Sequence, residues 1–340
     1  MTDTEGKLGG TLIGVGGWAY LPIRNVSKLG VCSKLYDFVE VNSTYYKLPE
    51  IKEVRSWRRE VPDTSFEFTV RANRVLTHEN HLQPTDENFK LFDKMLDICD
   101  ELDAKVLHFQ FPASLRVTSE VIRDWRDFFC SVASHKKNGI PDFAFEIRNS
   151  KSQESEQVKS FFEEYDIIPT SDPSRNNETP LGTSKDSGIA YSRVFGPGNR
   201  TSWSFDTDEL KKIEKRVEQT PAKKRYVTFH NITMYEDASR MKSMMAGESR
   251  GRSDTATRAP VGLESFKRTL ALANVEYPAT KETLKAQAGW RTFDLRSGRR
   301  VHVGEFLERL PDSKKFRSSD EVIDLLSSHL KVSSSEQKLT

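Results

Sequence analysis

The chain has 340 residues, of which 36% are hydrophobic, so it is long enough and apolar enough to bury a sizeable core. Its 52 basic and 50 acidic residues leave a net charge of +2, so only a local cluster could argue for a nucleic-acid partner. No stretch approaches the roughly 20 apolar residues of a membrane span. The first ten residues also lack the basic and apolar regions of a signal peptide. We therefore expect a cytoplasmic globular protein.

Eight segments have the β-branched and aromatic composition of strands, and helix-like patterning fills the spacers between them, most clearly over 88–101 and 119–133. Strand and helix alternating eight times over roughly 230 residues is typical of an α/β fold, the (β/α)8 TIM-type barrel, rather than of an open sheet. The predicted strands cover residues 12–16, 38–42, 66–71, 105–111, 142–148, 167–172, 189–195 and 225–231.

The composition divides the rest of the chain into short segments and one further domain. We expect a flexible N-terminus over 1–11, a polar linker over 246–262 and a frayed tail over 331–340. Between the linker and the tail, residues 263–330 predict a small, mainly helical domain, in which Thr280 is a plausible N-cap.

The three cysteines are odd in number and widely spaced, which indicates neither a disulfide framework nor a zinc site. We expect Cys32, Cys99 and Cys130 to be small buried hydrophobic residues.

Polar side chains close several of the predicted strands at alternate positions. Side chains alternate across a strand, so each such pair points to one face of its strand. A parallel barrel collects these strand ends at one mouth, where barrel enzymes place their chemistry. The pairs are Glu40 with Asn42, His108 with Gln110, and Glu146 with Arg148.

Five motifs occur in order over residues 12–245: Gly14-Val-Gly-Gly-Trp18-Ala-Tyr20, Glu40-Val-Asn42-Ser-Thr-Tyr45-Tyr46-Lys-Leu-Pro49, Thr77-His78, Gln110-Phe-Pro112 and Glu146-Ile-Arg148. Together they resemble the YecE-like family, a TIM-barrel domain of unknown function. This resemblance implies the barrel fold and leaves the activity open. The chain departs from the family pattern at Phe195, where a histidine is usual, at His230-Asn231 in place of Asn-Asn, and at 149–152. Residues 263–330 more weakly resemble another small domain of unknown function.

On the barrel interpretation, a ring of polar residues surrounds the mouth and includes three arginines and three carboxylates. Guanidinium groups bind phosphates and carboxylates bidentately, so the arginines indicate an anionic ligand. Alternatively, Arg148 and Arg193 only neutralise Glu146 and Asp172. The substrate-binding candidates are Trp18, Asn42, Tyr45, Arg71, Gln110, Arg148, Arg193 and Asn231.

For catalysis, Glu40 and Glu146 are candidates for an acid–base pair, because burial and nearby arginines can separate the pKa values of two carboxyls. The alternative is a hydrogen-bonded network that only closes the top of the barrel. Asp172 is a third candidate carboxylate, and His78, in a polar loop, is a fourth candidate catalytic residue.

A divalent metal is possible, since Glu40, Glu146, Asp172 and His230 could converge, although the chain has no HExxH motif. On strand parity, His230 and Asn231 face opposite ways, so both cannot line the mouth.

No nucleotide-cofactor fingerprint is present around Gly14 to Gly17. His108 is expected in the barrel interior. The aromatic residues Trp18, Tyr20, Tyr45 and Tyr46 could stack a sugar or a base, or pack in the core.

Two functions follow from these patterns. The first is an enzyme, a hydrolase or isomerase, that acts on an anionic substrate such as a phosphorylated sugar or a nucleic-acid end. The second is a non-catalytic adaptor that binds a ligand or nucleic acid and recruits a protein or nucleic acid through its C-terminal domain. The basic clusters at 211–216, 223–225 and 250–258 motivate the second function, because Lys and Arg contact phosphates.

Overall fold

The structure is a computed structural model and describes residues 10–21, 23, 26–133, 141–149, 152, 155–175, 182–197, 203–247, 261–273, 275–289, 291–296 and 299–330. The chain divides into two compact units. The first comprises Met1–Ala19, Asn25–Thr201 and Phe205–Asp254, and the second comprises Tyr20–Arg24, Ser202–Ser204 and Thr255–Thr340.

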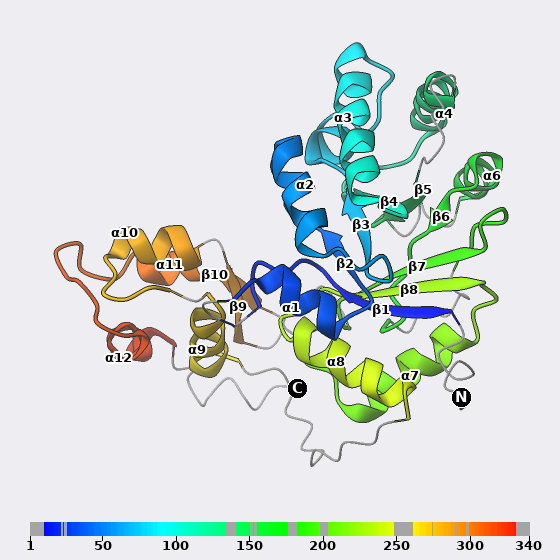
Figure 1. The fold of residues 1–340 in the computed structure, drawn as a ribbon. Helices are drawn as coiled ribbons and strands as arrows, with labels where there is room; N and C mark the ends of the chain where they lie inside the picture. The colour runs from blue at the N-terminus through cyan, green and yellow to red at the C-terminus, as the bar shows by residue number, and fades with distance from the viewer. Residues whose placement is uncertain are drawn as a thin grey trace. The chain divides into compact units, whose positions relative to one another are not determined.

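Within the described residues, the first unit holds eight parallel strands in the order β6-β5-β4-β3-β2-β1-β8-β7 (Figure 1). An isolated parallel bridge between Ser171 and Ser192 joins the two ends of this order, so the sheet forms a nearly closed barrel. The predicted (β/α)8 barrel is therefore confirmed. The strands are β1 (Thr11–Val15), β2 (Phe38–Val41), β3 (Glu67–Arg71), β4 (Val106–Phe111), β5 (Asp142–Ile147), β6 (Ile168–Pro169), β7 (Ile189–Val194) and β8 (Lys224–Phe229).

The helices of this unit follow the strands, and several of them begin at a residue whose side chain caps the helix. Thr85 accepts a hydrogen bond from the backbone N–H of Asn88 at the start of α3, and Asp206 and Glu209 form a capping box on α7. The two helices predicted most clearly are present as α3 and α4. The helices are α1 (Lys28–Leu35), η1 (Ser43–Tyr45), α2 (Ile51–Glu60), η2 (Val75–Glu79), α3 (Asp86–Leu102), α4 (Ser119–Ala133), α6 (Glu156–Tyr165), α7 (Thr207–Glu218) and α8 (Met234–Met245).

Aromatic side chains fill the layer between the sheet and the helices. Trp125 of α4 is fully buried and packs against Phe111 and Phe145 of the sheet, with ring centroids 4.9 Å and 5.4 Å away. Large rings bury much apolar surface, which favours this packing.

Inside the barrel, Gly14 lies against the ring of Phe38, and a Cβ at position 14 would come within 2.6 Å of that ring. Glycine is therefore required there, because its lack of a side chain leaves room for the Phe38 ring inside the barrel.

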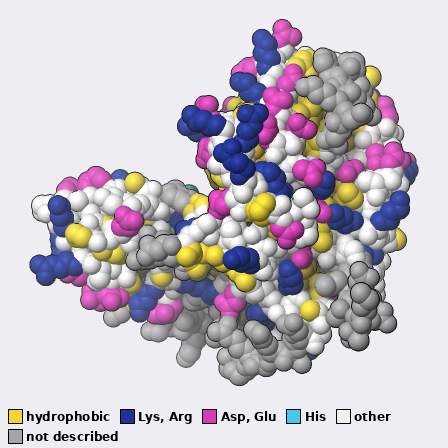
Figure 2. Space-filling model, in the orientation of Figure 1, with side chains coloured by type: hydrophobic (Ala, Val, Ile, Leu, Met, Phe, Trp, Pro, Cys, Tyr) yellow, Lys and Arg dark blue, Asp and Glu magenta, His cyan; other side chains and the backbone are white. Residues whose placement is uncertain are grey.

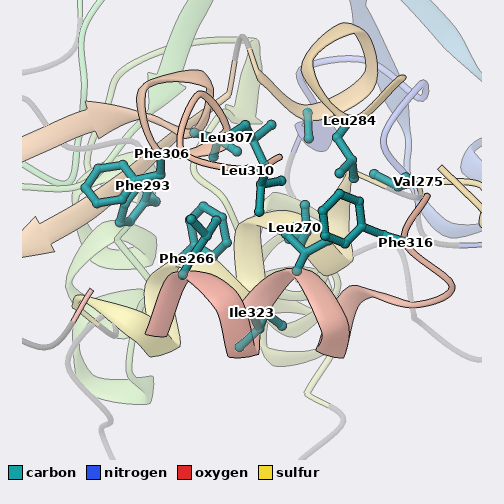
Figure 3. Close-up of a cluster of buried hydrophobic side chains, with 14 of the residues drawn as sticks. Phe266, Leu270, Val275, Leu284, Phe293, Phe306, Leu307, Leu310, Phe316 and Ile323 are labelled. Atoms are coloured by element: carbon teal, nitrogen blue, oxygen red, sulfur yellow. The ribbon is translucent and has the colours of Figure 1, made fainter. Parts of the chain in front are cut away.

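Within the described residues, the second unit contains helices and one antiparallel hairpin, and it has its own hydrophobic core (Figure 3). Thr280 caps α10, as predicted. The hairpin of β9 and β10 was not predicted. The elements are α9 (Leu263–Leu272), α10 (Lys281–Leu284), η3 (Lys285–Gly289), β9 (Thr292–Arg296), β10 (Arg299–His302), α11 (Val303–Leu307) and α12 (Ser319–Leu330).

The remaining sequence expectations have mixed outcomes. Cys32 and Cys99 are buried, but Cys130 is exposed on α4, so the expectation was wrong for this cysteine. Most of the predicted N-terminus, linker and tail lies outside the described residues. Among the helices of the described ranges, none combines the length and apolar character needed to cross a membrane.

The core of the second unit leads to a stability prediction. Phe293 is fully buried, with its ring centroid 5.1 Å from that of Phe266 and 5.2 Å from that of Phe306. Phe293→Ala should lower the free energy of unfolding of this unit by about 3–5 kcal/mol, because it removes a ring and leaves a cavity. Hydrogen exchange of peptides from 263–330 measures this loss.

Leu325→Ala is the matched control, because Leu325 is 45% exposed on α12 and its truncation should cost at most about 0.5 kcal/mol. Equal losses in the two variants would contradict the assignment of Phe293 to this core.

Candidate functional site

Arg193 of β7 lies at the centre of the barrel mouth and is almost completely buried. Its Nη1 donates to Gln110 Oε1 at 2.8 Å and to Glu146 Oε2 at 2.6 Å. Its Nη2 donates to Glu40 Oε1 at 2.9 Å, and its Nε donates to His230 Nε2 at 3.1 Å. One guanidinium thus ties together side chains from β2, β4 and β5 and from the residue after β8.

Glu40 is fully buried, and both of its oxygens accept hydrogen bonds. Oε1 faces Arg193, and Oε2 accepts from the hydroxyl of Tyr191 at 2.7 Å. The same hydroxyl lies 2.9 Å from Thr69 Oγ1. Burial, followed by the charge of Glu40, raises the pKa of Tyr191 well above its usual range, so the phenol remains a proton donor to the carboxylate.

Glu146 bridges two arginines and is 15% exposed. Its Oε1 accepts from Arg148 Nε at 2.7 Å, while its Oε2 accepts from Arg193. Burial alone would raise the pKa of Glu146, but the charges of Arg193 and Arg148 outweigh burial and hold this pKa well below its usual range. Glu146 is therefore a stable carboxylate.

Two histidines in the network are neutral. Burial and then the charge of Arg193 lower the pKa of both His108 and His230 well below the usual range. His108 lies in the interior, as predicted, with its Nε2 3.5 Å from Glu146 Oε2. His230 packs so closely on Gly16 that a Cβ there would come within 2.3 Å of its Nδ1, which makes glycine necessary at position 16.

Arg71, at the end of β3, is the least engaged arginine of the mouth. Its guanidinium carbon lies 3.8 Å from the ring centroid of Tyr45, and its Nη1 reaches Asn42 Oδ1 only at 3.5 Å. Its Nε is buried and has no hydrogen-bond partner. Burial, followed by repulsion from Arg193, lowers the pKa of Arg71 to about 10, so it is still charged at neutral pH.

His78 lies in η2, and its ring meets Tyr45 edge-on at 5.2 Å. Its Nδ1 is 2.9 Å from Thr77 Oγ1, and that hydroxyl donates its one hydrogen to the carbonyl of Asn73. With the hydroxyl donating to Asn73, His78 carries its proton on Nδ1 and its lone pair on Nε2, and we assign this tautomer. Burial, then the charges of Arg71 and Arg148, lower the pKa of His78 to about 4.

These contacts bring together fewer carboxylates than the sequence indicated. Asp172 is held in its own loop, where it accepts from Ser174 Oγ at 2.6 Å and from the backbone N–H of Phe195 at 3.2 Å. Burial raises the pKa of Asp172. The mouth network thus sets three arginines against two carboxylates, with neutral histidines, and carries a surplus positive charge.

Two other predicted residues lie outside the network. Asn231 donates to Asp237 Oδ2 at 2.6 Å, and Trp18 packs edge-on against Trp57 at 5.2 Å. Of the neighbours His230 and Asn231, it is the histidine that faces Arg193. The substrate-binding roles of Asn231 and Trp18 stay predictions.

The four predicted metal ligands are not assembled around one point. Glu40, Glu146 and His230 all contact the Arg193 guanidinium, which occupies the position where they converge, while Asp172 is held by its own loop. In the part of the chain that the structure covers, no group of three or more His, Cys, Asp or Glu side chains is placed to hold a metal ion.

Sequence reasoning missed two residues of this site. Tyr191 has the same strand parity as Arg193, two positions away, which is a signal that could have identified it. Phe195 lies 5.1 Å and 5.3 Å from the guanidinium carbons of Arg193 and Arg148, and its ring stacks on His230 at 5.0 Å. At the position where the family pattern has a histidine, this chain places an aromatic face beneath two cations.

Two solved structures of DUF72 family proteins agree with this architecture. A DUF72 family protein from Enterococcus faecalis matches with a TM-score of 0.56 and 17% identity, covering 71% of this chain and 97% of its own. A DUF72 family protein from Thermotoga maritima matches with a TM-score of 0.54 and 19% identity, covering 69% and 98%. A D-psicose 3-epimerase is more distant, with a TM-score of 0.48 and 10% identity over 70% of this chain and 99% of its own.

At the sequence level, no curated protein gives a significant match. The family model described as "Protein of unknown function DUF72" matches residues 12–261, which is well over half of the chain. The chain therefore belongs to the DUF72 family, which is the YecE-like family that its motifs resemble.

Proposed function

We propose that the barrel mouth binds a small anionic molecule and that the protein is an enzyme that acts on it by acid–base chemistry. The observation that carries the proposal is the unused donor capacity of Arg71. This guanidinium is charged, its Nε is buried without a partner, and its one side-chain hydrogen bond is long. A buried charged donor without a partner is costly, and an anionic ligand would satisfy it.

Arg148 is the second residue proposed to hold the anion. It uses Nε for Glu146 and is 41% exposed, so the rest of its guanidinium fork faces outward. Arg71 and His78 both contact the ring of Tyr45, at 3.8 Å and 5.2 Å from its centroid, and the charges of Arg71 and Arg148 both lower the pKa of His78. Two guanidinium groups and a neutral imidazole would together hold a phosphate or carboxylate group beside a base.

His78 is the proposed general base. We assign it the tautomer with the lone pair on Nε2, and its pKa of about 4 keeps it neutral at physiological pH. It would take a proton from the substrate or from a water molecule, as an isomerase or a hydrolase requires. An anion bound between the arginines would raise the pKa of His78 by offsetting their charges, which strengthens it as a base when the substrate is present.

Glu40 and Glu146 have a different role in this proposal from the acid–base pair expected from sequence. All four of their oxygens accept hydrogen bonds from arginine or tyrosine side chains. We assign them to holding Arg193 and Arg148 in place. This assignment supports the alternative interpretation, in which a hydrogen-bonded network of these carboxylates closes the top of the barrel. The proposed chemistry would then take place at Arg71, Arg148 and His78.

The adaptor alternative has less support from the basic clusters. Arg216 donates to the carbonyls of Pro173 and Arg175, and Lys224 pairs with Glu67, so both have structural partners. The cluster at 250–258 lies outside the described residues. On the face shown in Figure 2, basic and acidic side chains are interspersed, which does not favour a broad phosphate-binding surface there. Binding of nucleic acid, recruitment by the C-terminal domain and a cytoplasmic location stay proposals.

Arg71→Gln tests the anion site. We expect wild type to bind ribose 5-phosphate in calorimetry, and the variant to bind it about 10-fold to 150-fold more weakly, since a hydrogen bond to a charged group contributes about 1.5–3 kcal/mol. The matched control is Arg55→Gln, because Arg55 is 57% exposed and pairs with Glu101 between α2 and α3. Equal losses in the two variants would remove Arg71 from the site.

The pKa of His78 gives a prediction that needs no substrate. In NMR titrations, with the signal assigned by its loss in His78→Gln, His78 should titrate with a midpoint near 4. A histidine pKa lowered in the folded state means that His78 stays neutral down to about pH 5 and gains its proton below that. Arg71→Gln should shift the midpoint upward, because it removes the largest repulsive charge. A midpoint near the ordinary value of 6.5 would refute the predicted environment.

Turnover separates the enzyme from the adaptor. In a screen of sugar phosphates and phosphoesters, His78→Gln should reduce kcat by about 10²-fold to 10⁴-fold, the usual contribution of a general base. Its binding of the same compounds in calorimetry should stay close to that of wild type. Binding without turnover by wild type across the screen would favour the non-catalytic alternative.

A further inference from the structure

We infer that the anionic ligand carries an aromatic ring, as a nucleoside monophosphate does, and that Tyr46 stacks on that ring. The inference rests on the proposed function and narrows its substrate class. It begins from an exposed aromatic side chain beside the arginine that the anion would engage.

Tyr46 is 72% exposed, the largest exposed fraction among the exposed large hydrophobic side chains of the described residues. It directly follows η1, and its backbone N–H donates to the carbonyl of Ser43 at 3.1 Å, which fixes the backbone at this position. Its ring meets Tyr45 edge-on, with centroids 4.8 Å apart and an interplanar angle of 90°. An aromatic ring held on an ordered turn and left open to solvent is a prepared stacking surface.

The spacing suits a ligand with two parts. Arg71 and Tyr46 both contact the ring of Tyr45, with 3.8 Å from the Arg71 guanidinium carbon to the Tyr45 centroid and 4.8 Å between the centroids of Tyr45 and Tyr46. A phosphate on Arg71 therefore leaves Tyr46 within reach of a group attached through a short spacer. The pentose of a nucleotide is such a spacer.

Of the groups that an anionic ligand could carry, a flat aromatic ring buries the most apolar surface against Tyr46. It can cover the phenol ring face to face, whereas a phosphate or the edge of a pentose covers less of this apolar surface. Stacking of a base on an aromatic side chain is also tolerant of base identity, because every base has a π-face. The site would thus recognise an aromatic ring and a negative charge, and it would not distinguish one base from another.

The test compares adenosine 5′-monophosphate with ribose 5-phosphate by calorimetry on the full chain. Wild type should bind the nucleotide about 5-fold to 150-fold more tightly than the sugar phosphate, the contribution expected of one stacked base. Tyr46→Leu should bring this affinity ratio close to 1, and Tyr46→Phe, which keeps the aromatic face, should preserve it. Arg71→Gln should weaken binding of both compounds by a similar factor.

The possible results separate this inference from the proposed function. Equal affinity of wild type for the two compounds would overturn the stacking role of Tyr46 and leave the anion site standing. Binding of neither compound would overturn the proposed function and this inference with it. A preserved ratio in Tyr46→Leu would assign the ring preference to another residue and overturn the inference.

Binding of a 5′-phosphorylated single-stranded oligonucleotide shows whether the ring and the phosphate belong to the end of a nucleic-acid strand or to a free nucleotide. Affinity similar to that of the mononucleotide would support recognition of the ring and phosphate at a strand end. Binding of the mononucleotide alone would support a free nucleotide as the ligand.

Discussion

The arrangement of the barrel mouth depends on one buried cation, the guanidinium of Arg193. A guanidinium taken out of water must find acceptors for its fixed fork of donors, because an unpaired buried charge is strongly destabilising. Glu40, Gln110, Glu146 and His230 supply those acceptors from different strands. The alternation of side chains along each strand directs these acceptors into the barrel. Their orientation is then fixed by the hydrogen bonds that they accept from Arg193.

The same cation decides which groups are available for chemistry. By pairing with Glu40 and Glu146 it engages the two carboxylates of the mouth, and together with burial it keeps His108 and His230 neutral. The side chains of the mouth with open or weakly used polar atoms are therefore Arg71, Arg148 and His78. This part of the mouth is cationic because the two carboxylates already pair with arginines.

Sequence patterns could predict the barrel and much of its mouth, because both follow from local periodicity. The pairs that end β2, β4 and β5 place Glu40, Gln110 and Glu146 on the interior side. Periodicity could not predict that Tyr191 bonds to Glu40, since that contact joins residues 151 apart in the chain. It also could not show that Ser174 and Phe195 hold Asp172 outside the network, because this depends on the path of one loop. In the second unit, the β9 strand offered only Phe293 and Leu295 at alternate positions, which is too short a signal to distinguish from a helix end.

Phe195 shows how this chain differs from the pattern of the family it belongs to. A histidine at that position would add another group able to gain a proton beside Arg148 and Arg193, and each proton gained would add to an existing surplus of positive charge. The phenyl ring instead offers its face to both guanidiniums and to His230, which stabilises the cations without any dependence on pH. The positive character of the mouth is thus set by arginines, whose charge persists at physiological pH. His78 is the partly exposed imidazole of the mouth, and burial together with the charges of Arg71 and Arg148 keeps it neutral, so the arginines alone carry the positive charge.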